Sequence, residues 1–288
     1  MRSLMPLLLL GSPFLTSAKE PPVVTVTGFD YAFTAPDTIS SGITTFRFID
    51  RGVVDHHLII FRVAPTISLS EFYRVMSDGG PSPSGISSLG GLQTDKIYRN
   101  PRSRIPGYDR ARDLTMVLEP GRYVLACLHA EDGVSHLSKG MMRELTVMPS
   151  REKPTEPVFD ATLIMSDYRY AVSGPLTAGI RTIRIINDGP QEHHVFIQRM
   201  RAGATLEDIK SHRAARAKER AAGVPDPRSS LVPPMTPLTA VTRMSRGAQV
   251  FLTLELERGS YRLFCLVPDA ADGKPHTQHG MDQLITVR

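Results

Sequence analysis

The chain has 288 residues, a length that predicts about two domains of ordinary size. Its 41% hydrophobic and 22% charged residues give the balance of a globular protein, and its 23 prolines and 22 glycines predict a turn-rich, largely β structure. The formal net charge of +5 comes in part from two basic segments, residues 95–113 and 210–223. Neither segment interleaves aromatic residues in a nucleic-acid-binding pattern, so nucleic acid is not an expected partner. We expect solvated surfaces there; the alternative is a docking surface for an acidic redox partner.

The first 18 residues predict a signal peptide. Arg2 supplies the positive charge, residues 4–15 supply the apolar stretch, and Thr16, Ser17 and Ala18 form a small-residue cleavage site. The apolar run is too short to span a bilayer, and no later segment is long and apolar enough. The mature protein is therefore expected to be soluble, to have no membrane span, and to be periplasmic or secreted.

The sequence aligns with itself over most of its length. Residues 29–63 align without a gap with residues 166–200, at an offset of 137 that pairs Asp30 with Asp167. Agreement this long predicts duplication of a whole domain. The polar, Pro-rich segment between the copies predicts a linker. The expected organisation is a signal peptide (1–18), a first domain (19–148), a linker (149–157) and a second domain (158–288).

Each predicted domain contains several short strands. Residues 44–50 and their repeat 181–187 alternate apolar and polar positions and are followed by turns at Gly52 and Gly189. Further β-rich runs occupy residues 56–63, 122–128, 193–200 and 261–267. The pattern predicts an all-β fold class, with two tandem Greek-key β-sandwiches.

A long insert precedes the Cys-containing strand in each predicted domain. In the second domain, Thr205 and Asp208 form a capping-box pattern for a helix that runs to about Ala222. In the first domain, Ser68 followed by Glu71 predicts a shorter helix. The rest of each insert is rich in Pro, Gly and Ser and is expected to be loop. Each sandwich should therefore carry a partly helical insert before its Cys strand.

Four metal-ligating residue types recur in the same order in both predicted domains. They are His57, Cys127, His136 and Met141 in the first, and His194, Cys265, His276 and Met281 in the second. Two imidazoles and a thiolate in a trigonal array, with a long thioether contact, form the site of blue copper proteins. The soft sulfur ligands suit Cu(I), whereas imidazole serves both oxidation states.

Adjacent histidines make the first ligand of each set ambiguous. His56 precedes His57, and successive strand residues point to opposite faces. Arg62 shares a face with His56, and an Arg is expected to face water, so His57 and its repeat His194 are predicted to point inward. The alternative is that these inward residues are hydrogen-bonded core histidines without a metal.

Other readings of these residues stay open. Each Cys could pack as a small hydrophobe, and each Met could fill the core. A disulfide between the two cysteines is disfavoured because it would join equivalent interior positions of separate domains. His129 and His279 lack counterparts in the opposite half and are expected to be surface residues, although either could substitute as a ligand. An all-imidazole site would suit Zn(II) or Cu(II).

Both halves resemble cupredoxins, the blue copper proteins. The resemblance lies in the strand beginning at His57, the late Cys strand, and the spacing H-x-x-x-G-M in "HLSKGM" and "HTQHGM". It implies a β-sandwich with up to one copper ion per domain and a redox partner protein. One departure is the loop between Cys and His, which has eight residues in the first half and ten in the second. The halves realign at an Asp-Gly turn three residues before each His, which predicts that both loops return in the same way.

Three classes of function follow. The first is electron transfer or copper carriage by a two-domain cupredoxin-like protein. The second is a metal-free cupredoxin-like module that binds a partner. The third is a copper oxidoreductase, which is disfavoured because no His stands directly beside either Cys and nine histidines leave few for further metal clusters. No catalytic residues are predicted, because no motif of nucleophilic or acid–base catalysis stands out.

Overall fold

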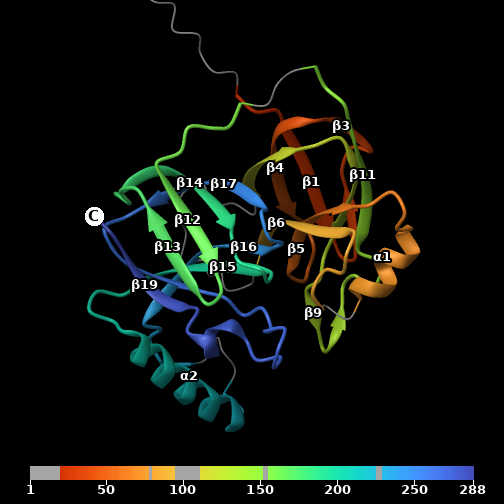
Figure 1. Cartoon of the computed structure of the whole chain (residues 1–288). Helices are drawn as coiled ribbons and strands as arrows, with labels where there is room; N and C mark the ends of the chain where they lie inside the picture. The colour runs from red at the N-terminus through yellow and green to blue at the C-terminus, as the bar shows by residue number, and fades with distance from the viewer. Residues whose placement is uncertain (1–19, 78–79, 95–110, 152–154, 225–228) are drawn as a thin grey trace, which may run out of the picture.

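The computed structural model describes residues 20–77, 80–94, 111–151, 155–224 and 229–288 (Figure 1). The predicted signal peptide and most of the basic segment 95–113 lie outside the described residues. Two α-helices are present in these ranges, α1 (Leu69–Met76) and α2 (Leu206–Ala221). None of the described helices is long and apolar enough to cross a membrane.

The remaining elements are almost all strands, as predicted. In the first half they are β1 (Val23–Phe29), β2 (Ala32–Thr34), β3 (Thr38–Ser40), β4 (Gly42–Asp50), β5 (His56–Val63), β6 (Ile86–Thr94), β7 (Ala111–Leu118), β8 (Gly121–Ala126), β9 (Ala130–Glu131), β10 (Val134–Ser135) and β11 (Met142–Met148). In the second half they are β12 (Ala161–Ser166), β13 (Arg169–Ser173), β14 (Gly179–Asn187), β15 (His193–Met200), β16 (Met235–Met244), β17 (Gln249–Leu256), β18 (Gly259–Phe264) and β19 (Asp282–Val287), with a 3₁₀ helix at His276–His279.

Two large sheets form the body of the molecule. One contains eight strands in the order β13-β12-β14-β17-β7-β4-β1-β2. The other contains nine, in the order β19-β18-β15-β16-β6-β5-β8-β11-β3. The apolar side chains between the sheets form one continuous core cluster with members from both halves. The chain crosses repeatedly from one sheet to the other, so the predicted all-β sandwich fold is confirmed.

The two halves have matching strand orders. The series β2-β1-β4-β7 in the first half corresponds to β13-β12-β14-β17 in the second. In the other sheet, β11-β8-β5-β6 corresponds to β19-β18-β15-β16. Both series end at the middle of their sheet, so the two halves meet through equivalent strands.

The junction between the halves has a local two-fold relationship. Leu58 on β5 pairs with Leu92 on β6, and its repeat Val195 on β15 pairs with Val241 on β16. Leu92 and Val241 therefore hold equivalent positions, and the structure pairs them with each other in antiparallel fashion. In the other sheet β17 pairs with β7 at Phe251 and Thr115. Hydrogen-bonded strands, and not only a linker, thus hold the halves together.

The strands at this junction come from the inserts, which corrects one expectation. Beyond its helix, each insert was expected to be loop, but it contributes β6 and β7 in the first half and β16 and β17 in the second. The sequence of β6, "ISSLGGLQT", hides the strand because small residues replace the usual β-branched ones. A Cβ on Gly91 would lie 1.8 Å from the carbonyl oxygen of Leu58, so glycine there permits close approach of β5.

Both predicted helices are confirmed with their caps. The Ser68 side chain accepts a hydrogen bond from the main-chain N–H of Glu71 at the start of α1. Thr205 and Asp208 form a complete capping box at the start of α2. Helix α1 packs Phe72 against Phe61 of β5, with ring centroids 5.3 Å apart. The outer face of β5 is therefore covered as well as its inner face.

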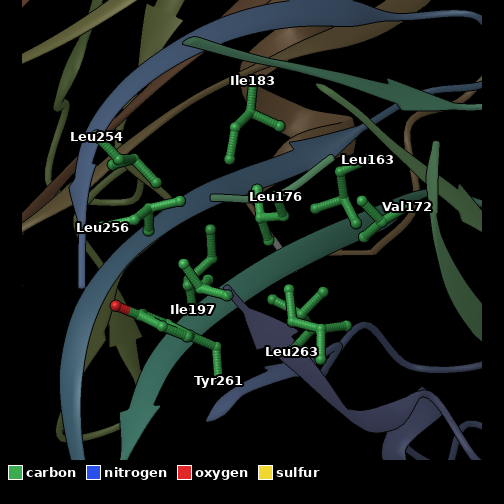
Figure 2. Close-up of a pocket in the computed structure, with 11 residues that line it drawn as sticks. Leu163, Val172, Leu176, Ile183, Ile197, Leu254, Leu256, Tyr261 and Leu263 are labelled. Atoms are coloured by element: carbon green, nitrogen blue, oxygen red, sulfur yellow. The ribbon is translucent and has the colours of Figure 1, made fainter. Parts of the chain in front are cut away.

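The second half contains a small pocket within its core (Figure 2). It lies between the two sheets and is lined by apolar side chains, among them Leu163, Ile197, Leu254 and Leu263. Tyr261 also lines it, but its hydroxyl is bonded to the main chain of Glu257. The pocket therefore offers no polar group to a ligand, and we regard it as a packing feature.

Candidate metal centres

Three donor side chains converge in the first half. His56 begins β5, Cys127 directly follows β8, and His136 directly follows β10. Their donor atoms lie within 4.8 Å of one another. The Nδ1 atoms of His56 and His136 are 3.1 Å apart, and Nδ1 of His136 is 3.6 Å from Sγ of Cys127. All three residues are fully buried.

The second half repeats this arrangement. Nδ1 of His193 lies 3.0 Å from Nδ1 of His276, which lies 3.5 Å from Sγ of Cys265. These three residues are also fully buried, and both cysteines of the chain are free thiols. The two halves thus contain matching His, Cys, His clusters.

The long Cys-to-His loops close onto the clusters by forming hairpins. In the first half β9 pairs with β10 around a turn at Asp132 and Gly133, which have φ values of 51° and 77°. The main-chain N–H of His136 then donates to the carbonyl of His129, 2.7 Å away. In the second half Pro268 bridges Pro275 around a turn at Gly273. Both loops return by a turn at the Asp-Gly step, as the sequence predicted.

The predicted methionines lie beside the clusters through main-chain bonds. The N–H of Met141 donates to the carbonyl of His136, and its own carbonyl accepts from the N–H of Cys127. Met281 makes the same two bonds to His276 and Cys265. Both methionines are fully buried.

The structure does not bring His57 and His194 into the clusters, which corrects the expected orientation of the two histidine strands. His56 and His193, one residue earlier, lie there instead. The argument from Arg62 fails because that residue lies near the far end of β5, where its guanidinium reaches Glu119 at the rim of the sandwich. Since α1 covers the outer face of β5, hydrophobicity did not distinguish the two faces.

A carboxylate orients the first histidine of each cluster. Nε2 of His56 lies 3.1 Å from Oδ1 of Asp30, and Nε2 of His193 lies 2.6 Å from Oδ1 of Asp167. A carboxylate at Nε2 places the ring proton there and leaves Nδ1 able to bind a metal. The pKa of Asp30 is lowered overall. Burial raises it, but the hydrogen bonds from His56 and from two main-chain amides together outweigh that effect. The sequence signal for this pair was the Asp30–Asp167 repeat, whose role was missed.

Two repeated glycines make room for these pairs. A Cβ on Gly52 would lie 2.1 Å from Nε2 of His56 and 2.6 Å from Oδ1 of Asp30. A Cβ on Gly189 would lie 2.8 Å from Nε2 of His193. The repeated glycines therefore do more than turn the chain, because any larger residue would displace the histidine from its carboxylate.

His57 and His194 contribute to the clusters through their main chains. Their N–H groups lie 3.2 Å from Sγ of Cys127 and 3.4 Å from Sγ of Cys265, respectively. The His194 ring is held elsewhere, because its Nε2 accepts a 2.6 Å hydrogen bond from the N–H of Leu266. Burial lowers the pKa of His194 to about 3, so this ring stays neutral at neutral pH.

The electrostatics of the clusters themselves favour neutral groups. Burial raises the pKa of Cys127 to about 12 and that of Cys265 to about 11. Burial, followed by the repulsion of neighbouring histidines, lowers the pKa of His136 to about 4. Neutral imidazole is the form of histidine that binds a metal, and the metal also supplies the positive charge that a buried thiolate requires. The donor set of two imidazoles and one sulfur fits copper.

A third group of possible ligands lies in and beside the Cys-to-His loop of the second half. Asp269, Asp272 and His279 have donor atoms within 4.8 Å of one another. Their hydrogen bonds are made within the loop: Asp272 contacts His279 and the N–H of Lys274, and Asp269 accepts from the Tyr168 hydroxyl at 2.5 Å. His279, expected at the surface, is partly exposed here. These bonds account for the group as loop structure.

No protein-family model and no curated protein sequence matches the chain. Among solved structures, auracyanin from Roseiflexus castenholzii is similar at 20% identity, covering 44% of this chain and 94% of that chain, with a TM-score of 0.28. An azurin from Methylomonas sp. strain J is 14% identical over 44% of this chain and 98% of that chain, with a TM-score of 0.27. A multicopper oxidase is 13% identical over 92% of this chain and 88% of that chain, with a TM-score of 0.25. In its β-sandwich fold and in the donor cluster of each half, the chain resembles cupredoxins.

Proposed function

We propose that this protein binds one copper ion in each half and acts outside the cytoplasm, in the periplasm or secreted, as an electron carrier or copper carrier. The observation that supports this most strongly is the convergence of three buried donors, from three separate chain segments, in both halves. The proposed ligands are His56, Cys127 and His136 in the first half and His193, Cys265 and His276 in the second. Met141 and Met281 would contribute their thioethers as weak further ligands.

Bound copper would supply a one-electron couple between Cu(II) and Cu(I). The protein supplies soft and borderline donors that suit both states, on strand ends fixed by two continuous sheets. The main-chain N–H groups of His57 and His194 donate toward the cysteine sulfurs and would help to stabilise the thiolates once copper is bound. Each binding event would release the thiol proton, because the empty site holds its cysteine protonated.

Absorption spectra of copper-loaded variants test this proposal. The mature protein with Cu(II) is expected to show an intense thiolate-to-copper charge-transfer band. Cys127→Ala and Cys265→Ala should each remove the contribution of one half, and the double variant should remove all of it. His56→Gln should abolish the band of the first half.

A matched variant tests the ligand assignment. His57→Gln keeps the main-chain N–H that points at Cys127 and should retain the band at equilibrium. The opposite result, loss with His57→Gln and retention with His56→Gln, would show that the first ligand is assigned to the wrong histidine. Colourless protein that keeps no copper after dialysis would leave a metal-free binding module as the function.

A further inference from the structure

The buried clusters have no exposed donor atom of their own to receive a metal ion from solvent. His56, Cys127 and His136 are fully buried, as are their counterparts. A copper ion must therefore pass other side chains before it reaches the sulfur. The rate at which copper reaches the sulfur should depend on the side chains that contact each cluster. Those side chains differ between the two halves.

In the first half a partly exposed imidazole contacts the cluster. The His129 ring lies edge-on to the His136 ring, with centroids 5.1 Å apart. The same His129 ring lies 4.8 Å from the His57 ring, at an interplanar angle of 60°. Both His57 and His129 are partly exposed. A continuous series of imidazoles thus leads from the surface to the ligand His136.

The second half lacks this series. Val267, which is buried, stands two residues after its Cys, where the first half has His129. The counterpart of His57 is His194, whose Nε2 is occupied by the N–H of Leu266. Tyr168 lies edge-on to His276, as its repeat Tyr31 does to His136, and the Tyr168 hydroxyl is hydrogen-bonded to Asp269. No half-exposed imidazole pair touches this cluster among the described residues.

We propose that the partly exposed His57 and His129 form an imidazole pair that binds copper first and transfers it to the buried cluster of the first half. This proposal rests on the proposed copper-binding function. The transfer is ligand exchange without a change of oxidation state. Copper–nitrogen bonds to the pair replace bonds to water, and they are replaced in turn by bonds to the buried imidazoles and to sulfur. The cysteine proton leaves to solvent as the copper–sulfur bond forms.

The rate of copper loading tests the transfer role. In a Cys265→Ala background only the first half produces the charge-transfer band, so its growth after rapid mixing of the metal-free protein with Cu(II) reports one site. His129→Val, which installs the residue of the second half, is expected to slow this growth at least tenfold while the final absorbance stays the same. His57→Gln should also slow the growth of the band.

Two further measurements complete the design. His212→Gln, on α2 and away from both clusters, serves as the control and should leave the rate unchanged. In a Cys127→Ala background, where the second half alone reports, loading should be slower than in the first half, and His129→Val should have no effect on it.

The possible outcomes separate this inference from the proposed function. An unchanged loading rate in His129→Val would overturn the transfer role while leaving copper binding intact. Loss of final absorbance in that variant would show that His129 is a ligand of the site, which also contradicts the proposal. Absence of the band from the unmodified protein, together with loss of all copper on dialysis, would refute copper binding and with it the transfer.

Discussion

The two halves place the same donors in different surroundings. Both clusters have a histidine–carboxylate pair, a buried thiol and a main-chain N–H aimed at sulfur. The first cluster has a buried acid, Asp50, at 4.0 Å from Nε2 of His56, where the second half has Asn187; the second cluster has its own buried acid, Asp269, at 3.8 Å from Nε2 of His276. A tyrosine ring lies edge-on to the second histidine of both clusters, Tyr31 at His136 and Tyr168 at His276, but the first cluster also contacts the partly exposed His129. Although the ligands are duplicated, we therefore expect the two copper sites to differ in reduction potential and in loading rate. Both quantities depend on residues around the ligands, and these residues differ between the halves.

The largest expected effect comes from the glycines beside the histidine–carboxylate pairs. Gly52→Ala should lower the copper affinity of the first half by about 100-fold, because its Cβ would lie 2.1 Å from Nε2 of His56. Gly189→Ala should have a smaller effect, since the closest approach there is 2.8 Å. Competition with a chelator, followed through the charge-transfer band in single-Cys backgrounds, measures both. Equal losses would contradict the geometric difference.

The next effect concerns the reduction potentials of the two sites. The Asp50 carboxylate should stabilise Cu(II) over Cu(I) and so lower the potential of the first site. Asp50→Asn, which copies the second half, should raise it by on the order of 100 mV at an effective dielectric constant of about 20. Asn187 shows that an amide can keep the structural bond, because its Oδ1 accepts from Gly189 N–H as Oδ1 of Asp50 accepts from Gly52 N–H. Spectroelectrochemical titration of single-site variants tests this, and a shift confined to the second site would refute it.

A smaller effect is expected from the carboxylates that orient the histidines. Asp30→Asn and Asp167→Asn should each lower the copper affinity of their own half by about tenfold, because the amide binds the imidazole N–H more weakly. The loss should be greater for Asp167, whose contact is shorter. The same chelator competition measures the change. An unaltered affinity in both variants would show that burial alone orients the rings.

The smallest effect concerns the pH dependence of stability in the metal-free protein. The pKa of His194 is lowered to about 3 by burial, whereas an unfolded histidine titrates near 6.5. The unfolded state therefore binds the proton first, and stability is complete above about pH 6.5 and falls as the pH decreases toward 3. Allowing for the partial exposure of this ring, His194→Gln should remove about 1 kcal/mol of the stability lost between pH 7 and pH 5. Denaturant unfolding at the two pH values measures it; an identical pH dependence in the variant would argue against a neutral buried ring.

Much of the fold could be predicted because it depends on local patterns. The alternation in β4 and β14, the caps at Ser68 and Thr205, and the Asp-Gly turns each act within a few residues. The strands of the inserts were missed because β6 and β16 gain their stability from neighbours distant in the sequence. Leu92, for example, packs between strands of both halves, a setting that a short run of small residues does not reveal.

The candidate site was predictable in composition and ambiguous in detail. Cys127 and His136 lie together as their spacing suggested, and their counterparts do the same. The choice between His56 and His57 required knowledge of which face of β5 lies between the sheets. Since α1 covers the other face with Phe72 and Met76, both faces are apolar and the pattern gives no preference.

The sequence by itself determined the kinds of donor, their order and the turns that return each loop, because these depend on residue chemistry and on short-range geometry. Only the tertiary structure decided which histidine reaches each sulfur, which carboxylate holds it, and how the halves join. Those features depend on side chains brought together from distant segments, and the packing of two continuous sheets is what sets their distances.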